Sequence, residues 1–366
     1  MNGAASGWID PATATMCPLE GCAIVVLGYG NQGRAQALNL HDSLKAAPRA
    51  GAGVRVWARA GGASARQALR DGFEVIDTAA LGTGDLFLCL LPDEVQGAFI
   101  TETLTPAVRA GGRPGRIGFA HGGALAFTEL GEHLRRPPWV ETFLVAPSGP
   151  GVDVRDEFAA GWGVPALLAI WHDQSGAAYD RALAVATGIG ATRAGVWRTT
   201  VAAEAAVDLF GEQAVICGGI TALLRCAYQT LMRQGYDPEM AYLECVHQLR
   251  LTAELIHRHG VAGMRERISG TARFGDLTRG PRLAEAGVAR AMADILSEIE
   301  SGAFMREWQA EVRAGSPRLE AWRGGIDQDS MEMVGRDVRA HVLRPEPSGG
   351  RRSGGSGVSG EQGESR

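Results

Sequence analysis

The feature that most constrains the fold is a change of sequence pattern near residue 200. Between about residues 22 and 170, short β-rich runs alternate with stretches of helical character. The runs are CAIVVLG, VRVWA, LFLCLL, RIGFA, TFLVAP and ALLAI. This alternation is typical of βα units that build a largely parallel sheet. From about 200 to 342 the strand signals vanish and apolar residues recur at helical spacing, with Asp237 and Pro238 marking one helix start.

The pattern predicts an α/β domain followed by an all-α domain. We expect a Rossmann-type nucleotide-binding domain over residues 1–200 and a helical domain over 201–342. The low-complexity segment that completes the chain, residues 343–366, is rich in Gly and Ser and is expected to be a disordered tail.

Composition excludes several classes of protein. The 366 residues are 45 % hydrophobic and carry a net charge of −5, so the chain can bury two cores and gives no reason to expect a nucleic-acid or membrane partner. No apolar run approaches the ~20 residues of a bilayer span, and the amino terminus lacks a signal-peptide pattern. The six cysteines show no CxxC spacing and lie mostly in apolar runs, which indicates buried thiols in a reducing compartment. We expect a cytoplasmic protein.

The sequence GYGNQG at residues 28–33 follows the first β-rich run and precedes a helix. Gly28, Gly30 and Gly33 fit GxGxxG, in which glycines allow a tight turn, close approach to a pyrophosphate and close packing of helix on strand. The second run ends in Arg59, with Ser64 shortly after, where an NAD site more often carries an acid. These residues suit a 2′-phosphate and favour NADPH, although Arg59 can also be an ordinary solvated arginine.

The sequence DLFGEQ at residues 208–213 places two carboxylates on one helical face. Asp208 and Glu212 are four residues apart in an otherwise small and apolar run. Like charges at this spacing repel each other, so the pair indicates a role that offsets the cost, such as binding a cation.

Several motifs in a fixed order carry a family resemblance. They are GYGNQGRAQALNL, LLPDEVQ, FAHGG, VAPSGPG, GIGATRAGV, DLFGEQAVICGG, PEMAYLECVHQL and ISGTARFGDLTRGPR. From about residue 19 to 340 the chain resembles the short, class I form of ketol-acid reductoisomerase.

The resemblance implies an NADPH- and Mg²⁺-dependent enzyme of branched-chain amino-acid synthesis. Such an enzyme shifts an alkyl group within a 2-hydroxy-2-alkyl-3-keto acid such as 2-acetolactate, and then reduces the resulting 2-keto acid with a hydride. It also implies a knotted helical domain and a homodimer whose active sites are shared between two chains.

The resemblance also assigns roles to individual residues. Asp208 matches a ligand that bridges two Mg²⁺ ions, Glu212 a ligand of one ion and Glu244 a ligand of the other, with Gln248 one turn later. His121 matches a catalytic histidine that carries a proton, and Ser269 a serine that holds the substrate carboxylate. The residues expected at the cofactor are Gly28, Tyr29, Gly30, Asn31, Gln32, Gly33, Arg59, Ser64, Asp93, Gln96 and Gly151.

The chain departs from the family pattern at two central positions. Gln248 stands where relatives have glutamate, so the second ion should be held more weakly. Ser148 stands where relatives have lysine, and the single lysine, Lys45, expected in the loop after the first Rossmann helix near the cofactor side, is a poor substitute. Together these two changes remove one anion and one cation and leave the net charge of the site unchanged. After His121 the sequence GGALAF alters the pocket wall. Arg273 adds a charge near the substrate mouth, unless it is a solvated surface arginine.

Three functions follow from these residues. The first is a working ketol-acid reductoisomerase. The second is a divergent NADPH-dependent reductase or isomerase of a related 2-keto acid in a specialised biosynthetic pathway, because a weakened metal site should harm the alkyl shift more than a carbonyl reduction. The third is a non-catalytic NADP-binding homologue, against which the retained carboxylates argue.

Overall fold

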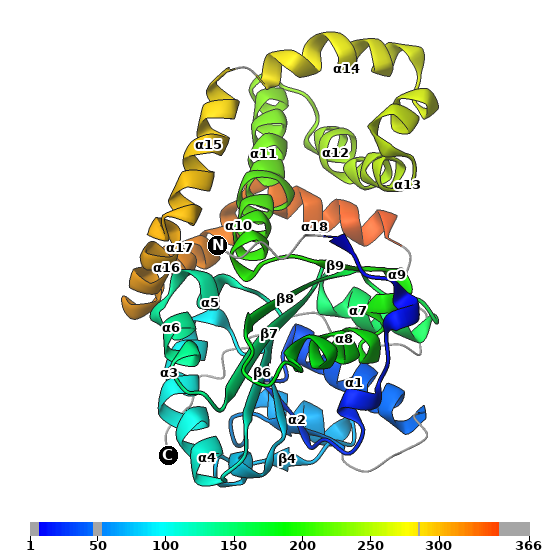
Figure 1. The fold of residues 1–366 in the computed structure, drawn as a ribbon. Coiled ribbons are helices and arrows are strands. Elements are labelled where there is room, and N and C mark those ends of the chain that lie inside the picture. Colours follow the sequence, from blue (N-terminus) through cyan, green and yellow to red (C-terminus); the bar gives the residue numbers. More distant parts are fainter. Residues whose placement is uncertain (1–6, 47–52, 285, 344–366) are drawn as a thin grey trace. The chain divides into compact units, whose positions relative to one another are not determined.

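The structure is a computed structural model that describes residues 7–46, 53–284 and 286–343 (Figure 1). It divides into two compact units. Among these described residues, the sheet unit comprises those within 7–221 and 274–319, and the helical unit comprises those within 222–273 and 320–343. In this division, residues 274–319 group with the sheet. The expected domain boundary at residue 200 remains a prediction.

The sheet unit contains a nine-stranded sheet of order β1-β9-β8-β7-β6-β5-β2-β3-β4. Its pairs are parallel except β7 with β8 and β1 with β9, which confirms the expected largely parallel sheet. All six β-rich runs form strands, whereas the sequence did not indicate the short strands β1, β4 and β9. The strands are β1 (Gly7–Trp8), β2 (Ile24–Leu27), β3 (Val54–Trp57), β4 (Val75–Ile76), β5 (Leu86–Cys89), β6 (Gly115–Phe119), β7 (Val140–Pro147), β8 (Ala166–His172) and β9 (Val196–Arg198).

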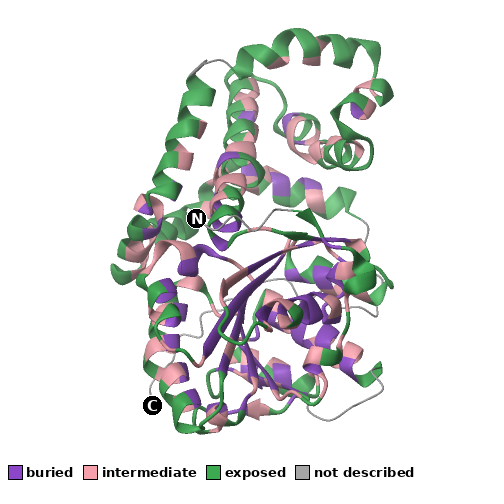
Figure 2. Cartoon of the chain, viewed as in Figure 1, coloured by how far each residue is buried: buried purple, intermediate pink, exposed green. Residues whose placement is uncertain are grey.

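Helices cover both faces of this sheet (Figure 1). Along β2, Ile24 and Val26 join one apolar core while Val25 and Leu27 join the other, as the alternation of a strand requires. Both cores are closed by helices, so the strands are buried on each side (Figure 2). The helices up to residue 211 are α1 (Asn31–Ala46), α2 (Ala63–Arg70), α3 (Asp93–Phe99), α4 (Thr105–Ala110), α5 (Gly123–Phe127), α6 (Glu129–Arg135), α7 (Gly151–Ala159), α8 (Ala178–Gly188), α9 (Ala191–Ala194) and α10 (Val201–Gly211).

The described chain is helical throughout after β9, as the sequence predicts. Asp237 caps α12 by accepting a hydrogen bond from the Met240 N–H at 2.9 Å, and Pro238 is its first residue, so the predicted start is confirmed. A small core in the helical unit includes Tyr228 and Tyr242. The remaining helices are α11 (Gly218–Arg233), α12 (Pro238–Tyr242), α13 (Leu249–Arg267), α14 (Gly270–Leu283), α15 (Ala286–Glu300), α16 (Ala303–Arg313), α17 (Pro317–Gly325) and α18 (Ser330–Val342).

Both helices that carry the predicted metal-ligand pairs contain a π-helical turn. The turn η5 (Glu212–Ile216) follows α10, and the Cys217 N–H donates to the Glu212 carbonyl five residues back, at 3.0 Å. The turn η6 (Leu243–His247) precedes α13, and the Gln248 N–H likewise donates to the Leu243 carbonyl at 3.2 Å. Such turns are rare and recur at functional sites.

One expectation about apolar length is wrong. Because η5 joins α10 to α11, Val201–Arg233 forms one helix that is long and apolar enough to cross a membrane by length and composition alone. Only 11 % of its most apolar window is buried within the chain. This is weak support for a membrane span, and its first half carries the carboxylates Glu204, Asp208 and Glu212.

Two further expectations fail, and one lies outside the description. Of the six cysteines, all free, only Cys89 is buried, because it alone lies on a strand of the sheet. Lys45 lies in the last turn of α1, at the end remote from the glycine turn, and not in a loop near the cofactor. The expected tail lies outside the described residues apart from Leu343.

Candidate active site

The glycine turn has the geometry that the motif requires. Gly28 has φ +92°, and a Cβ there would lie 2.8 Å from the Leu90 carbonyl oxygen. A Cβ on Gly33 would lie 2.2 Å from the Gly28 carbonyl oxygen, so only glycine lets α1 pack this closely. A Cβ on Gly30 would meet nothing within 4 Å. The turn therefore presents open space and the first N–H groups of α1 to an anionic ligand.

Neighbouring residues brace this turn. Gln32 Nε2 donates to the Gly149 carbonyl at 2.8 Å, and a Cβ on Gly151 would lie 2.3 Å from the Asn31 carbonyl oxygen. The structure thus places Gln32, Asn31 and Gly151 together where α7 begins. The Tyr29 side chain is buried and donates to Asp71 at 2.9 Å, so it faces the protein and leaves only its backbone toward the open side.

The residues predicted to select NADPH follow β3, which pairs with β2. Arg59 is exposed, and its carbonyl accepts from the Gly62 N–H at 3.0 Å in a turn whose third residue, Gly61, has φ +70°. Ser64 is half-buried in the first turn of α2. The turn leaves the Arg59 guanidinium free to meet an anion near the carboxyl end of β3.

A histidine flanked by carboxylates lies at the carboxyl ends of β5 and β6. His121 Nδ1 lies 3.3 Å from Asp93 Oδ2, at the start of α3, and Nε2 lies 3.1 Å from Asp208 Oδ2 on α10. Among the described residues no group has hydrogen-bond geometry to this buried nitrogen, although Asp208 lies within ion-pair distance of it. Gln96 is buried, and its Nε2 donates to Asp93 and to the Leu91 carbonyl. Asp93 and Gln96 therefore join the site through His121.

A third carboxylate, Glu204, belongs to this cluster. Glu204 is 2 % exposed, and its Oε2 accepts from the Gly122 N–H at 2.8 Å. Among the described residues, His121, Glu204 and Asp208 form the one group of three or more His, Cys, Asp or Glu whose ligand atoms all lie within 4.8 Å of one another. Glu204 was not predicted, although its position four residues before Asp208 continues the Asp208–Glu212 spacing and could have revealed it.

Burial and repulsion shift the pKa values in this cluster. Burial would lower the pKa of His121, but the carboxylates of Asp208 and Asp93 outweigh it and raise that pKa. Burial, reinforced by Asp208, raises the pKa of Glu204 to about 7. Burial and Asp208 also raise the pKa of Glu212, whose side chain remains largely exposed. This excess of carboxylates would be stabilised by a cation.

The second predicted pair lies in the helical unit. Glu244 and Gln248 are both exposed, and Gln248 Nε2 donates to Glu244 Oε2 at 2.5 Å. Ser269 is exposed and its Oγ accepts from the Ala272 N–H at 3.2 Å. Arg273 is exposed as well. In the sheet unit, Ser148 is exposed and its N–H donates to the Pro165 carbonyl at 2.8 Å.

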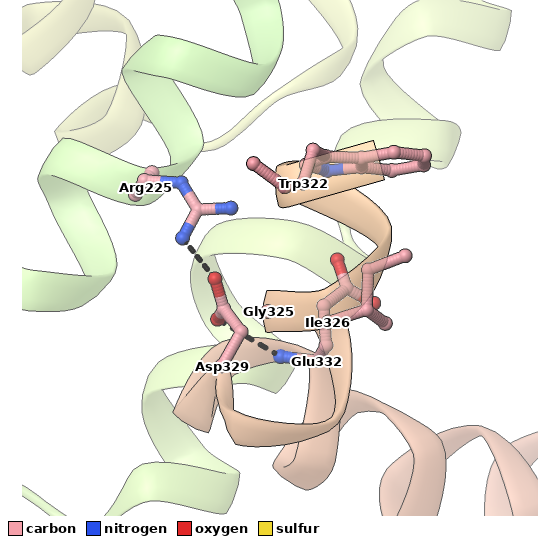
Figure 3. A pocket seen from close by; sticks show the side chains of 7 residues that line it. Arg225, Trp322, Gly325, Ile326, Asp329 and Glu332 are labelled. Atoms are coloured by element: carbon pink, nitrogen blue, oxygen red, sulfur yellow. Dashed lines mark hydrogen bonds and ion pairs between the residues drawn. The ribbon is translucent and has the colours of Figure 1, made fainter. Parts of the chain in front are cut away.

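A pocket of about 490 Å³ in the helical unit holds none of the predicted site residues (Figure 3). Its cation, Arg225, is already paired with Asp329, which also caps α18. Trp322 lines the same pocket. We assign the chemistry to the glycine turn and the His121 cluster instead.

The fold and this cluster define a dinucleotide-binding enzyme with an acidic site beside the cofactor turn. Residues 18–195 match the family model for the acetohydroxy acid isomeroreductase NADPH-binding domain, and residues 201–343 match that for the ketol-acid reductoisomerase C-terminal domain. The chain belongs to the ketol-acid reductoisomerase family.

Individual relatives agree with this assignment. The chain is 42 % identical over 328 residues to a ketol-acid reductoisomerase (NADP(+)) of Pyrobaculum calidifontis, covering 89 % of this chain and 96 % of the relative. It is 35 % identical to the solved NADH-preferring ketol-acid reductoisomerase of an uncultured archaeon, with a TM-score of 0.84 over 92 % of this chain and 100 % of that one. A semialdehyde dehydrogenase NAD-binding protein of Cupriavidus necator, 20 % identical with a TM-score of 0.52 over 76 % of this chain and 98 % of that one, shares the fold alone.

Proposed function

We propose that the chain is a ketol-acid reductoisomerase that acts on a 2-hydroxy-2-alkyl-3-keto acid such as 2-acetolactate. The observation that carries this proposal is the juxtaposition of the open glycine turn with His121, Asp208 and Glu204 at the carboxyl edge of one sheet. Ligands of open α/β sheets bind at this edge. Family membership supports the reaction, in which an alkyl group moves from C2 to C3 and a hydride then reduces the new C2 ketone.

NADPH is the proposed hydride donor. The glycine turn would hold the pyrophosphate, and Arg59 with Ser64 would hold the 2′-phosphate. The relatives differ in cofactor, since one is named for NADP(+) and another as NADH-preferring. The exposed arginine where an NAD site more often has an acid supports NADPH.

The residues of the site fit Mg²⁺. Asp208 and Glu212 offer exposed carboxylates one turn apart, and Glu244 with Gln248 offers a carboxylate and an amide. Hard oxygen ligands of this kind suit magnesium. When bound, Mg²⁺ would supply Lewis acidity toward the hydroxyl and carbonyl oxygens of the substrate.

The chain's own residues would position the substrate and move its protons. His121 lies within reach of Asp93 and Asp208, whose carboxylates favour the protonated imidazolium, so it can hold a proton at Nε2 and donate it to a substrate oxygen. Glu204 fixes the backbone that follows His121 through its bond to the Gly122 N–H. Ser269 would bind the substrate carboxylate through its hydroxyl.

We further propose a cytoplasmic homodimer whose active sites take residues from both chains. Large apolar side chains along Val201–Arg233 are exposed in the single chain, including Val207, Ile216 and Leu223. Several large apolar side chains exposed on one helix are costly in water, which supports an interface along it. The knotted topology also remains a prediction.

A second candidate is a reductase that has lost the alkyl shift. It is favoured by the Gln248–Glu244 hydrogen bond, in which the amide N–H of Gln248 donates to one carboxylate oxygen of Glu244 and so occupies an oxygen that could otherwise bind a cation. The exposed Ser148 supplies no cation to the site. A carbonyl reduction needs less charge stabilisation than a migration does.

NADPH consumption distinguishes these functions. The purified protein with Mg²⁺ is offered 2-acetolactate and, separately, the already isomerised 3-hydroxy-3-methyl-2-oxobutanoate. We expect turnover of both. Turnover of only the second would establish the reductase, and turnover of neither with NADPH bound would refute both candidates in favour of a non-catalytic homologue. Asp208→Asn should abolish the activity. Asp173→Asn serves as the control, because Asp173 follows the end of β8, which lies next to the start of β7 and away from the carboxyl ends of the parallel strands.

A further inference from the structure

A single carboxylate next to the glycine turn accepts four hydrogen bonds. Asp71 Oδ2 accepts from Tyr29 Oη at 2.9 Å and from Arg34 Nε at 2.7 Å. Asp71 Oδ1 accepts from Arg34 Nη2 at 3.2 Å and from Gln67 Nε2 at 2.9 Å. The Asp71 side chain is only 13 % exposed. Both oxygens are thus fully used, in a bidentate pair with the guanidinium of Arg34.

The donors come from different parts of the cofactor-binding region. Tyr29 lies within the glycine turn, Arg34 in the first turn of α1, and Gln67 in α2. Asp71 itself ends α2, where its N–H donates to the Gln67 carbonyl at 3.0 Å. The Tyr29 ring also packs edge-on against Phe73, with centroids 5.7 Å apart. The carboxylate therefore ties the end of α2 to the turn that would hold the pyrophosphate.

The other end of α2 carries the residues that would recognise the 2′-phosphate. Ser64 lies in its first turn, and the turn formed by Arg59 and Gly62 leads into it. The fully buried side chains of α2 are Ala65 and Ala68, which are small. Two alanines bury little apolar area, so the polar contacts of Asp71 contribute much of what fixes the position of α2.

Arg34 is oriented by this carboxylate and is not directed at a ligand. Two of its guanidinium nitrogens bond to Asp71, although its side chain remains 38 % exposed. The pair is neutral as a whole, so it adds no net charge beside the open turn. Any effect of the Arg34–Asp71 pair on cofactor binding must therefore come from how it positions the glycine turn and α2, and not from its charge.

We propose that Asp71 is a positioning residue that sets the distance between the pyrophosphate turn and the 2′-phosphate residues Arg59 and Ser64, and so determines the preference for NADPH over NADH. This rests on the proposed use of NADPH. Loosening α2 moves Arg59 and Ser64 away from the 2′-phosphate. NADH lacks that phosphate and retains its contacts to the glycine turn.

The test compares dissociation constants for NADPH, NADH and 2′,5′-ADP, measured by titration of the purified full chain. In Asp71→Ala we expect binding of NADPH and 2′,5′-ADP to weaken about tenfold relative to NADH, with kcat at saturating cofactor nearly unchanged. Asp71→Asn keeps one acceptor oxygen and should give an intermediate change. Because NADPH and NADH share the same pyrophosphate, any contact that the freed Arg34 makes with it should affect both cofactors equally and leave their ratio unaltered.

Two further variants keep the proposal falsifiable if Asp71→Ala folds poorly. Tyr29→Phe removes only the bond from the turn to α2 and should shift the ratio in the same direction by a smaller factor. Asp173→Ala is the matched control, because Asp173 also accepts several hydrogen bonds but caps the loop after β8, at the opposite edge of the sheet. It should leave the ratio unchanged.

The possible failures are distinguishable. Tight NADPH binding by the wild type with the same NADPH to NADH ratio in Asp71→Ala overturns the role of Asp71 alone. An equal loss for both cofactors also overturns it, since that result shows a structural role without selectivity. Failure of the wild type to bind either cofactor overturns the proposed function as well.

Discussion

If Glu244 binds Mg²⁺ as proposed, the neutral amide of Gln248 should limit how tightly its helix holds the ion, and Gln248→Glu tests this directly. In the structure Gln248 Nε2 donates to Glu244 Oε2 at 2.5 Å, and both residues are exposed. Glutamate at 248 replaces this bond with two like charges one turn apart. At such a spacing the cost without a cation is about 0.2–0.5 kcal/mol.

In the presence of Mg²⁺ the effect of Gln248→Glu on stability should change from destabilising to stabilising. The variant offers a second carboxylate to a hard cation, and we expect it to bind Mg²⁺ about tenfold more tightly, a gain of about 1.4 kcal/mol. At saturating Mg²⁺ the same gain appears as stability, because the ion binds only the folded state. The variant should therefore melt slightly below the wild type in EDTA and a few degrees above it in Mg²⁺.

The assay is thermal unfolding in EDTA and in Mg²⁺, with calorimetric titration of the ion. Gln229→Glu is the matched control, since it makes the same chemical change on an exposed helix whose residues one turn away are Arg225 and Arg233. If Gln248→Glu gains no Mg²⁺ affinity over this control, residue 248 does not face a cation and the assignment of Glu244 as a ligand is refuted. Adding Ser148→Lys should then raise turnover of 2-acetolactate relative to the isomerised keto acid.

Three other substitutions test the bracing of the glycine turn, the charge of Asp71 and the proposed dimer interface. Gly151→Ala places a Cβ 2.3 Å from the Asn31 carbonyl oxygen, so we expect the melting temperature to fall and NADPH affinity to drop at least tenfold; unchanged NADPH binding would contradict the bracing role. The pKa of Asp71 is lowered because its bonds from Arg34 and Tyr29 outweigh the effect of burial, so its contribution to stability is present above the unfolded pKa of about 3.9 and is lost as pH falls through the folded pKa. In denaturant titrations, the free energy of unfolding of Asp71→Asn should fall less steeply with decreasing pH than that of the wild type. An equally steep fall in both proteins would refute this. Leu223→Asp should shift a dimer toward monomer in light scattering, whereas Leu69→Asp, at a leucine on α2 that is more exposed, should not.

Much of the sheet was predictable because parallel strands buried on both faces appear as continuous apolar runs. CAIVVLG and LFLCLL became β2 and β5, which pair in register. The strands β1, β4 and β9 were not indicated, because two or three residues are too few to show a periodic pattern. The apolar helix Val201–Arg233 was underestimated because its carboxylates break the run of apolar letters without ending the helix.

The candidate site was predictable where chemistry is local and not where it depends on distant contacts. The glycine turn, PDEVQ and FAHGG each follow a strand, so a parallel sheet brings them to one edge. The burial of Glu204 depends on Gly122, 82 residues away, which no local pattern reveals. The sequence likewise gave no sign that Tyr29, inside the glycine motif, points into the protein toward Asp71.

The π-helical turns determine how the two helices that carry the predicted ligands respond to a change in chain length. A π turn accommodates one residue more than an α turn, and one residue in an α-helix corresponds to a rotation of about 100°. Because the wide turn already absorbs one extra residue, deleting a single residue from Glu212–Ile216 would let the helix continue regularly with the flanking side chains on nearly the same faces. A deletion in the regular part of α10 would instead turn every later side chain about 100° relative to those before it. These two helices should therefore tolerate the loss of one residue within the π turn better than the loss of one residue elsewhere along their length.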